Sequence, residues 1–150
     1  GYLVAPQDVI SRAWSFKSGG AVSQFTALAV AELMKGGLDQ HIEVQNRALL
    51  VKRDAMLAAL GENFGGSVTW TTPRGGLYVW VKFPEGTDLA AVQEQVYEEG
   101  VGYYNGVQFS PSGEGANYLR LCFGHPPAET VYQGIGELAR ILDRIGVFPG

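Results

Sequence analysis

The segment 67–83 constrains the fold more than any other part of the sequence, because it contains two strand-like runs joined by a tight turn. Residues 67–72 and 76–83 are rich in β-branched and aromatic side chains, and Pro73, Arg74 and Gly75 lie between them. Two such runs around a short turn predict an antiparallel hairpin. The chain must therefore build a sheet, and other elements must cover the apolar side of that sheet.

The remaining elements indicate how the sheet is covered. Apolar residues recur at helical spacing in the segments 7–17, 23–35, 38–60, 87–99 and 128–145, with Ser23 as the expected N-cap of the second. Short strands are expected at 1–6, 101–104, 107–109 and 118–123. The order beyond residue 60 predicts an α/β fold of the α+β kind, with helices packed on a small, mostly antiparallel sheet.

The composition argues against several classes of protein. Lys and Arg are scattered and the formal net charge is −4, so a nucleic-acid partner is not expected. No apolar run reaches the roughly 18 residues that span a bilayer, and no basic, apolar signal sequence opens the chain. Cys122 is expected to be buried, and His41 and His125 are too isolated to suggest a metal site. These features predict a cytoplasmic protein with neither a membrane nor a nucleic-acid partner.

Four stretches in a fixed order carry a family resemblance. They are GYLVAP at 1–6, QNR through KRD at 45–54, WTTPRGGLYVW at 70–80 and YLRLCF at 118–123. Together they resemble the C-terminal portion of pyridoxal-phosphate (PLP)-dependent aminotransferases of class I and II, fold type I. The branch with 2-aminoadipate, aromatic and branched-chain aminotransferases is the most similar. Asn105 and Gly106 depart from the pattern, because relatives usually have Pro-Gly there.

The resemblance implies a division of the chain. Residues 1–37 would be the end of the large PLP-binding domain, 38–60 an interdomain helix, and 61–150 the small C-terminal domain. The opening strand, with no initiator methionine before it, likewise predicts a missing upstream sheet. The resemblance further implies a homodimer, amino-acid and 2-oxo-acid substrates, and a PLP-binding lysine outside this chain. The chain alone is therefore expected to have no catalytic residue and no activity, and its cofactor-binding residues are unassigned.

Arg120 is the expected binding residue for the substrate α-carboxylate. It interrupts an apolar strand, and its guanidinium can offer two parallel N–H donors to a planar carboxylate. From the residues alone, an internal ion pair with Glu114 or Glu129 is an equally good interpretation, and the resemblance favours the substrate. Gly75 and Gly76 are also expected to bind substrate, because they let backbone approach a ligand closely, although a hairpin turn alone explains them too.

Several other residues need an assignment. Tyr78 and Trp80 share one face of their strand and are expected in the core. Tyr103, Tyr104 and Phe109 could line an apolar substrate pocket.

The segment 15–18 imitates the Ser-x-x-Lys pattern of a PLP-binding lysine. Lys17 nevertheless follows the Gly-Tyr strand instead of preceding it, and a lysine at a helix end explains it.

Two rival functions stay open from the sequence. One is the effector-sensing domain of a winged-helix transcription regulator with an aminotransferase-like domain. The other is a PLP-dependent lyase or acyl transferase of the same fold, because the cofactor carries the reaction and many reactions share one fold.

Overall fold

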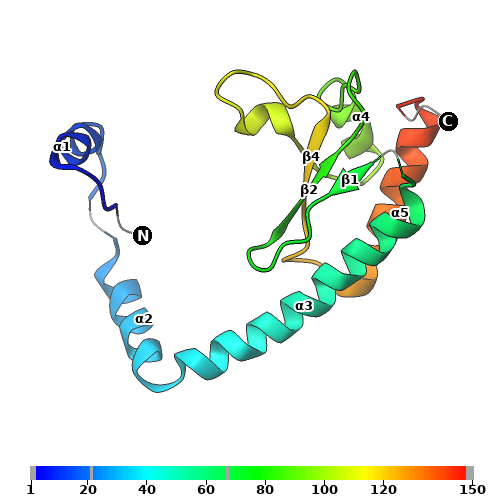
Figure 1. Ribbon diagram of the computed structural model, residues 1–150. Coiled ribbons are helices and arrows are strands. Elements are labelled where there is room, and N and C mark those ends of the chain that lie inside the picture. Colours follow the sequence, from blue (N-terminus) through cyan, green and yellow to red (C-terminus); the bar gives the residue numbers. More distant parts are fainter. Residues whose placement is uncertain (1–2, 21, 67, 148–150) are drawn as a thin grey trace. The chain divides into compact units, whose positions relative to one another are not determined.

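A computed structural model describes residues 3–20, 22–66 and 68–147 of the chain (Figure 1). The chain divides into two compact units, residues 1–42 and 43–150. Helix α3 (Leu38–Asn63) runs through the boundary. The sheet and the buried core belong to the second unit. Among the described residues, no helix has the length and apolar content needed to cross a bilayer.

The first unit contains α1 (Gln7–Ser15) and α2 (Gln24–Gly36), and neither helix has a buried residue. The Oγ of Ser23 accepts a hydrogen bond from the backbone N–H of Thr26 at 3.4 Å, which confirms the predicted N-cap. The predicted strand at 1–6 is wrong for residues 3–6, where Leu3 and Val4 are exposed and unpaired; its first two residues lie outside the described part. A strand needs a neighbour, and the described residues of this unit contain none.

The described residues of the second unit form a four-stranded sheet of β1 (Thr69–Trp70), β2 (Tyr78–Lys82), β3 (Tyr104–Asn105) and β4 (Tyr118–Cys122). The strand order is β1-β2-β4-β3, and every pairing is antiparallel. The predicted hairpin is confirmed. The strand predicted at 107–109 is instead the 3₁₀ helix η1 (Gly106–Phe109), because the N–H of Ser110 bonds locally to the carbonyl of Val107 instead of extending a ladder.

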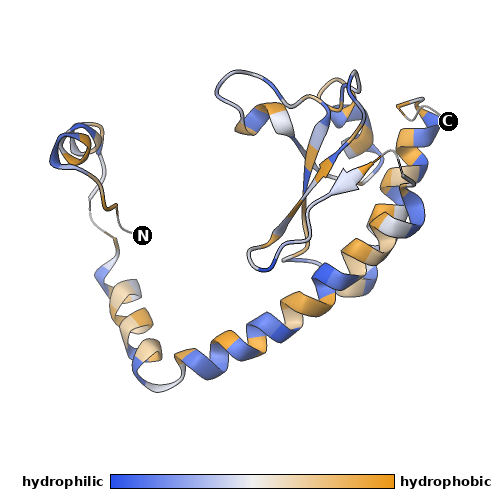
Figure 2. Ribbon diagram, viewed as in Figure 1, coloured by the Kyte–Doolittle hydropathy of each residue, from blue (hydrophilic) through white to orange (hydrophobic). Residues whose placement is uncertain are grey.

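One face of the sheet is the core face. Val79, Val81, Leu119 and Leu121 are buried there against the helices. The covering side chains come from the C-terminal half of α3, from α4 (Gln93–Glu98) and from α5 (Ala128–Arg144). Figure 2 shows hydrophobic and hydrophilic residues alternating along α3, whose buried residues Met56, Ala59 and Leu60 all lie in its C-terminal half. The predicted fold class, helices on a small antiparallel sheet, is confirmed.

The opposite face corrects two sequence interpretations. Tyr78 is exposed and Trp80 is only half-buried, so neither belongs to the core, and Cys122 is exposed instead of buried. Successive strand residues point to opposite faces. Because Val79 and Val81 occupy the core face, Tyr78 and Trp80 must occupy the other one.

The helix predicted at 87–99 begins later than expected. The Asp88 carboxylate accepts hydrogen bonds from the backbone N–H groups of Ala90 and Ala91, at 3.1 and 3.0 Å. These bonds hold a turn in place of the first helical turns, and α4 starts at Gln93. The adjacent residue Leu89 is fully buried and anchors this turn in the core.

Tyr103 corrects a third interpretation, because it lies in the core and not in a substrate pocket. Its ring is 5% exposed, and its hydroxyl donates to the carbonyl of Leu89 at 2.7 Å. Burial, aided by the negative charge of Asp88, raises the pKa of Tyr103 above its usual value. A raised pKa in the folded state means that this contribution to stability is complete below about pH 10 and is lost at higher pH.

Tyr103→Phe is therefore expected to have two effects on the protein that contains this chain. At neutral pH the free energy of unfolding should fall by about 1–3 kcal/mol, because the Leu89 carbonyl loses its partner. Above pH 10 the stability of the variant should fall less steeply than that of the wild type. Urea unfolding at pH 7, 9 and 11 measures both effects. Parallel pH profiles for the two proteins would contradict this assignment.

Candidate functional site

The face opposite the core centres on Arg120. This residue lies in the middle of β4, opposite Trp80 of β2 on one side and Tyr104 of β3 on the other. Its Cζ atom lies over three aromatic rings, 4.0 Å from the centroid of Tyr78, 4.1 Å from that of Phe109 and 5.2 Å from that of Tyr104. We call Tyr78, Tyr104 and Phe109 the aromatic collar.

Arg120 has no ion pair among the described residues. The predicted alternative, an internal salt bridge with Glu114 or Glu129, is not formed. The Nε atom is buried and has no hydrogen-bond partner in the described part of the chain. An unsatisfied buried donor costs about 1–3 kcal/mol, more when it is charged. Such a group calls for an acceptor from a ligand or from another part of the protein, and a carboxylate suits the guanidinium fork.

The local fold explains how the collar reaches the guanidinium. Tyr78 and Tyr104 lie on the same sheet face as Arg120, on the two strands that flank it. Phe109 ends η1 and packs edge-on against Trp80, with the ring centroids 5.3 Å apart. A ring on each flanking strand and one on the following 3₁₀ turn therefore converge on one charge.

Two glycines bring η1 close to the start of β4. A Cβ atom on Gly106 would lie 2.4 Å from the carbonyl oxygen of Gly115 and 2.8 Å from the Cβ of Tyr118. Gly115 itself has φ +93°, a conformation that side chains rarely allow. The residue pair Asn105 and Gly106, which departs from the family pattern, thus ends β3 and starts η1.

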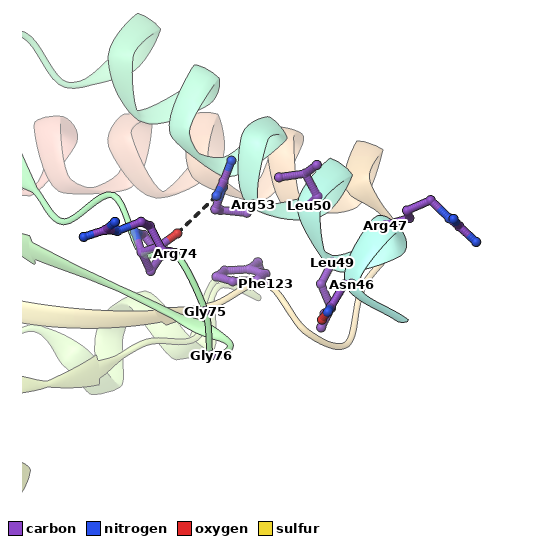
Figure 3. Close-up of a pocket in the computed structure, with 10 residues that line it drawn as sticks. Asn46, Arg47, Leu49, Leu50, Arg53, Arg74, Gly75, Gly76 and Phe123 are labelled. Atoms are coloured by element: carbon purple, nitrogen blue, oxygen red, sulfur yellow. Dashed lines mark hydrogen bonds between the residues drawn. The ribbon is translucent and has the colours of Figure 1, made fainter. Parts of the chain in front are cut away.

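Gly75 and Gly76 lie at the tip of the hairpin, and Gly76 has φ +79°. They border a cavity of about 350 Å³ whose other lining residues are Asn46, Arg47, Leu49, Leu50, Arg53, Pro73, Arg74 and Phe123. Arg53 holds the hairpin against α3, because its Nη1 donates to the carbonyl of Pro73 at 3.2 Å (Figure 3). Arg120 does not line this cavity, so the predicted substrate-binding residues do not converge there.

The cavity does not form an obvious anion site. Figure 3 shows the side chains of Arg47 and Arg74 pointing away from each other and away from Phe123, which lies between them. The guanidinium of Arg53 is already paired with Asp54 at 2.6 Å. The cations at this cavity therefore do not face one common point.

The lysine side chains each have an oxygen partner within the chain. The Nζ of Lys17 donates to the carbonyls of Gly19 and Gly20 at 3.0 and 2.8 Å. Lys35 pairs with Glu32, Lys52 donates to the carbonyls of Gly124 and His125, and Lys82 pairs with Glu85. Each lysine of the chain thus has an oxygen partner, and the location of the PLP-binding lysine outside this chain stays a prediction. The described residues also contain no cluster of ligands that could hold a metal ion.

Comparisons with known proteins agree with this architecture. The aminotransferase class I and II family matches residues 1–134. The chain is 36% identical over 119 residues to aromatic-amino-acid aminotransferase 1 of Thermococcus litoralis, covering 79% of this chain and 28% of that protein. It also resembles the crystal structure of the α-aminoadipate aminotransferase LysN of Thermus thermophilus in complex with N-(5'-phosphopyridoxyl)-L-leucine. That match has a TM-score of 0.72 and 33% identity, over 77% of this chain and 30% of that one.

A third relative has another kind of name. The chain is 27% identical over 148 residues to the uncharacterized HTH-type transcriptional regulator YdfD of Bacillus subtilis, covering 97% of this chain and 30% of the regulator. The chain thus spans less than a third of the length of each of these proteins. The family match nevertheless includes β2, β4 and most of the core. On this match and on the shared fold, the chain belongs to the class I and II aminotransferases.

Proposed function

We propose that this chain is the substrate-carboxylate-binding part of an enzyme that transfers an amino group between an amino acid and a 2-oxo acid. The observation that carries the proposal is Arg120, a guanidinium on the central part of the sheet with no ion-pair partner among the described residues and a buried, unsatisfied Nε. A planar carboxylate would satisfy this group and fix the orientation of a substrate.

The cofactor and the residues of this chain would have different roles in the reaction. PLP, held by residues outside this chain, would supply the electron sink for the amino-group transfer. Arg120 would bind the substrate carboxylate, and the aromatic collar would exclude water from that pair, which strengthens its charge interaction. Gly75 and Gly76 would let the hairpin backbone approach the substrate without a side chain in between. The aromatic collar is compatible with a substrate that has an apolar side chain.

The same proposal covers the organisation of the whole protein. Residues 1–37 would complete the large domain, 38–60 would link the domains, and 61–150 would form the small domain. The exposed apolar side chains of α1 and α2, among them Trp14, Phe25 and Leu28, support a role of these helices at an interface. We propose a cytoplasmic homodimer in which these helices are covered, acting on small amino acids and 2-oxo acids and on neither nucleic acid nor membrane.

Assay of the full-length protein tests the proposed reaction. With PLP, a panel of amino acids and 2-oxoglutarate or pyruvate as acceptor, formation of glutamate or alanine is expected for at least one donor. Release of ammonia or carbon dioxide without amino-acid formation would identify a lyase instead. Thiol release from an acyl-coenzyme A substrate would identify an acyl transferase.

The isolated chain is expected to form no stoichiometric PLP adduct on one lysine, since its Ser-x-x-Lys-like segment follows the Gly-Tyr strand instead of preceding it. Mixing it with a modest excess of PLP, reducing with borohydride and mapping the peptides by mass spectrometry measures this. Lys17→Ala serves as the matched control. Stoichiometric labelling of Lys17, lost in that variant, would overturn the assignment of the PLP-binding lysine to another segment.

An effector-sensing domain of a transcription regulator is the second candidate, and the similarity to YdfD over nearly the whole chain favours it. The sequence of the full-length protein decides between the two. A basic winged-helix domain at its N-terminus, together with sequence-specific DNA binding that an amino acid alters, would support the regulator.

A further inference from the structure

We propose that Tyr78, Tyr104 and Phe109 are positioning residues that hold Arg120 by the face of its guanidinium and leave its N–H edge free for a carboxylate. This inference rests on the proposed function for the identity of that carboxylate as the substrate's. It concerns three residues beyond Arg120, none of which is expected to touch the reacting atoms.

The choice of aromatic partners has a chemical consequence. A guanidinium donates its hydrogen bonds in its own plane, whereas a ring attracts it through the face. An Asp or Glu partner would occupy the N–H donors of Arg120 and neutralise its charge, so it would compete with a carboxylate ligand. The two nearest rings lie 4.0 and 4.1 Å from Cζ, close enough for a cation–π interaction, which uses none of the N–H donors.

The collar is itself held in place, which a positioning role requires. Phe109 contacts Trp80 and Tyr104 edge-on, with centroid distances of 5.3 and 6.2 Å. The ladder of the sheet fixes Tyr78 and Tyr104 on the two strands beside Arg120. With three rings around its Cζ atom, the long arginine side chain loses part of its rotational freedom before any ligand binds. A ligand that meets a preordered arginine avoids that loss on binding.

The experiment compares Phe109→Leu with Phe109→Tyr in the full-length, PLP-loaded protein. Leucine keeps the apolar volume and loses the ring, whereas tyrosine keeps the ring. Isothermal titration with 3-phenylpropanoate and with glutarate, two carboxylates that lack an amino group, measures the dissociation constant. Tyr97→Leu is the matched control, because Tyr97 is an aromatic residue on α4 that is 71% exposed.

Phe109→Leu is expected to raise the dissociation constant by roughly 3- to 10-fold, the effect of ordering one long side chain on binding. Phe109→Tyr should restore tight binding, and Tyr97→Leu should leave it unchanged. The reaction of 2-phenylethylamine, which has no carboxylate for Arg120 to bind, should lose less than the binding of the two carboxylates. If Phe109→Leu is poorly folded, Tyr104→Leu replaces it, because Tyr104 lies on the edge strand and is 53% exposed.

Three results would overturn the inference. These are an unchanged dissociation constant in the leucine variants, an equal loss for the amine and the carboxylates, or a failure of Phe109→Tyr to rescue binding. The outcome is separable from that of the proposed function. If the protein binds these carboxylates through Arg120 and the collar but forms no amino acid, the inference about the collar stands and the proposed amino-group transfer is wrong. If the Phe109→Leu variant transaminates normally, the proposed transfer stands and the inference about the collar is wrong.

Discussion

Arg120→Lys in the full-length protein is expected to lower kcat/KM for amino-acid substrates by roughly 30- to 1000-fold. Lysine keeps the positive charge but loses the planar fork that binds a carboxylate through two parallel hydrogen bonds. Losing part of a charge-assisted pair in a closed site costs on the order of 2–4 kcal/mol, which converts to that range of rates. Steady-state kinetics with the best amino-acid donor measures the change.

Two controls separate substrate binding from folding. PLP absorbance should survive the substitution, because the proposal places the cofactor on residues outside this chain. An amine without a carboxylate should react about equally with wild type and variant, since the guanidinium has nothing to hold in that substrate. If the variant unfolds while its folded fraction keeps full activity, Arg120 is a structural residue and the site assignment is wrong.

Gly106→Ala is expected to destabilise the small sheet by about 3 kcal/mol or more. The new methyl group would lie 2.4 Å from the Gly115 carbonyl oxygen, so the backbone of η1 or of the loop before β4 must move. Overpacking of a tight contact commonly costs about 1–3 kcal/mol, and a clash with backbone cannot be relieved by a side-chain rotation. Urea unfolding of the full-length protein, followed by circular dichroism, measures the loss.

Gly134→Ala is the matched control for that substitution. Gly134 lies inside α5, and a Cβ atom there meets nothing within 4 Å. Alanine is favoured over glycine in a helix interior, so this variant should gain about 0.5–1 kcal/mol. A small, equal effect of both substitutions would show that the Gly106 and Gly115 backbones are not in tight contact in solution.

The hairpin and the main helices could be predicted because their signals are local. The turn residues Pro73 to Gly75 separate two strand-like runs, and the apolar spacing of 128–145 matches α5 to within a residue at its C-terminal end. The strand predicted at 1–6 failed over its described residues 3–6 because strand formation depends on a neighbouring strand, which the described residues of that unit lack. The 107–109 segment failed because its backbone bonds locally, from the N–H of Ser110 to the carbonyl of Val107, which periodicity does not report.

Arg120 could be identified as a candidate because a single charge in an apolar strand is conspicuous. Two of its aromatic neighbours were harder to assign. Tyr78 and Trp80 look like core residues by composition, although Lys82 continues the same alternation and indicates that their face tolerates a charge. Following that alternation would have placed Tyr78 on the face of Lys82 and outside the core. No local signal, however, shows that Tyr103 points into the core while Tyr104 points to the site, because that depends on the register of β3 with β4.

Strand β4 lies between β2 and β3, so its main chain is hydrogen-bonded on both sides. Backbone that is paired on both sides exchanges its amide hydrogens only through large openings, whereas turns and edges open easily. The main chain beneath Arg120 is therefore among the last parts of the sheet to open. The hairpin tip at Gly75 and Gly76 and the loop 111–114 have no strand partner, so their backbone opens more readily. Under the proposed function, the hairpin tip and this loop are therefore the places where a change in sequence alters substrate preference while the arginine keeps its position.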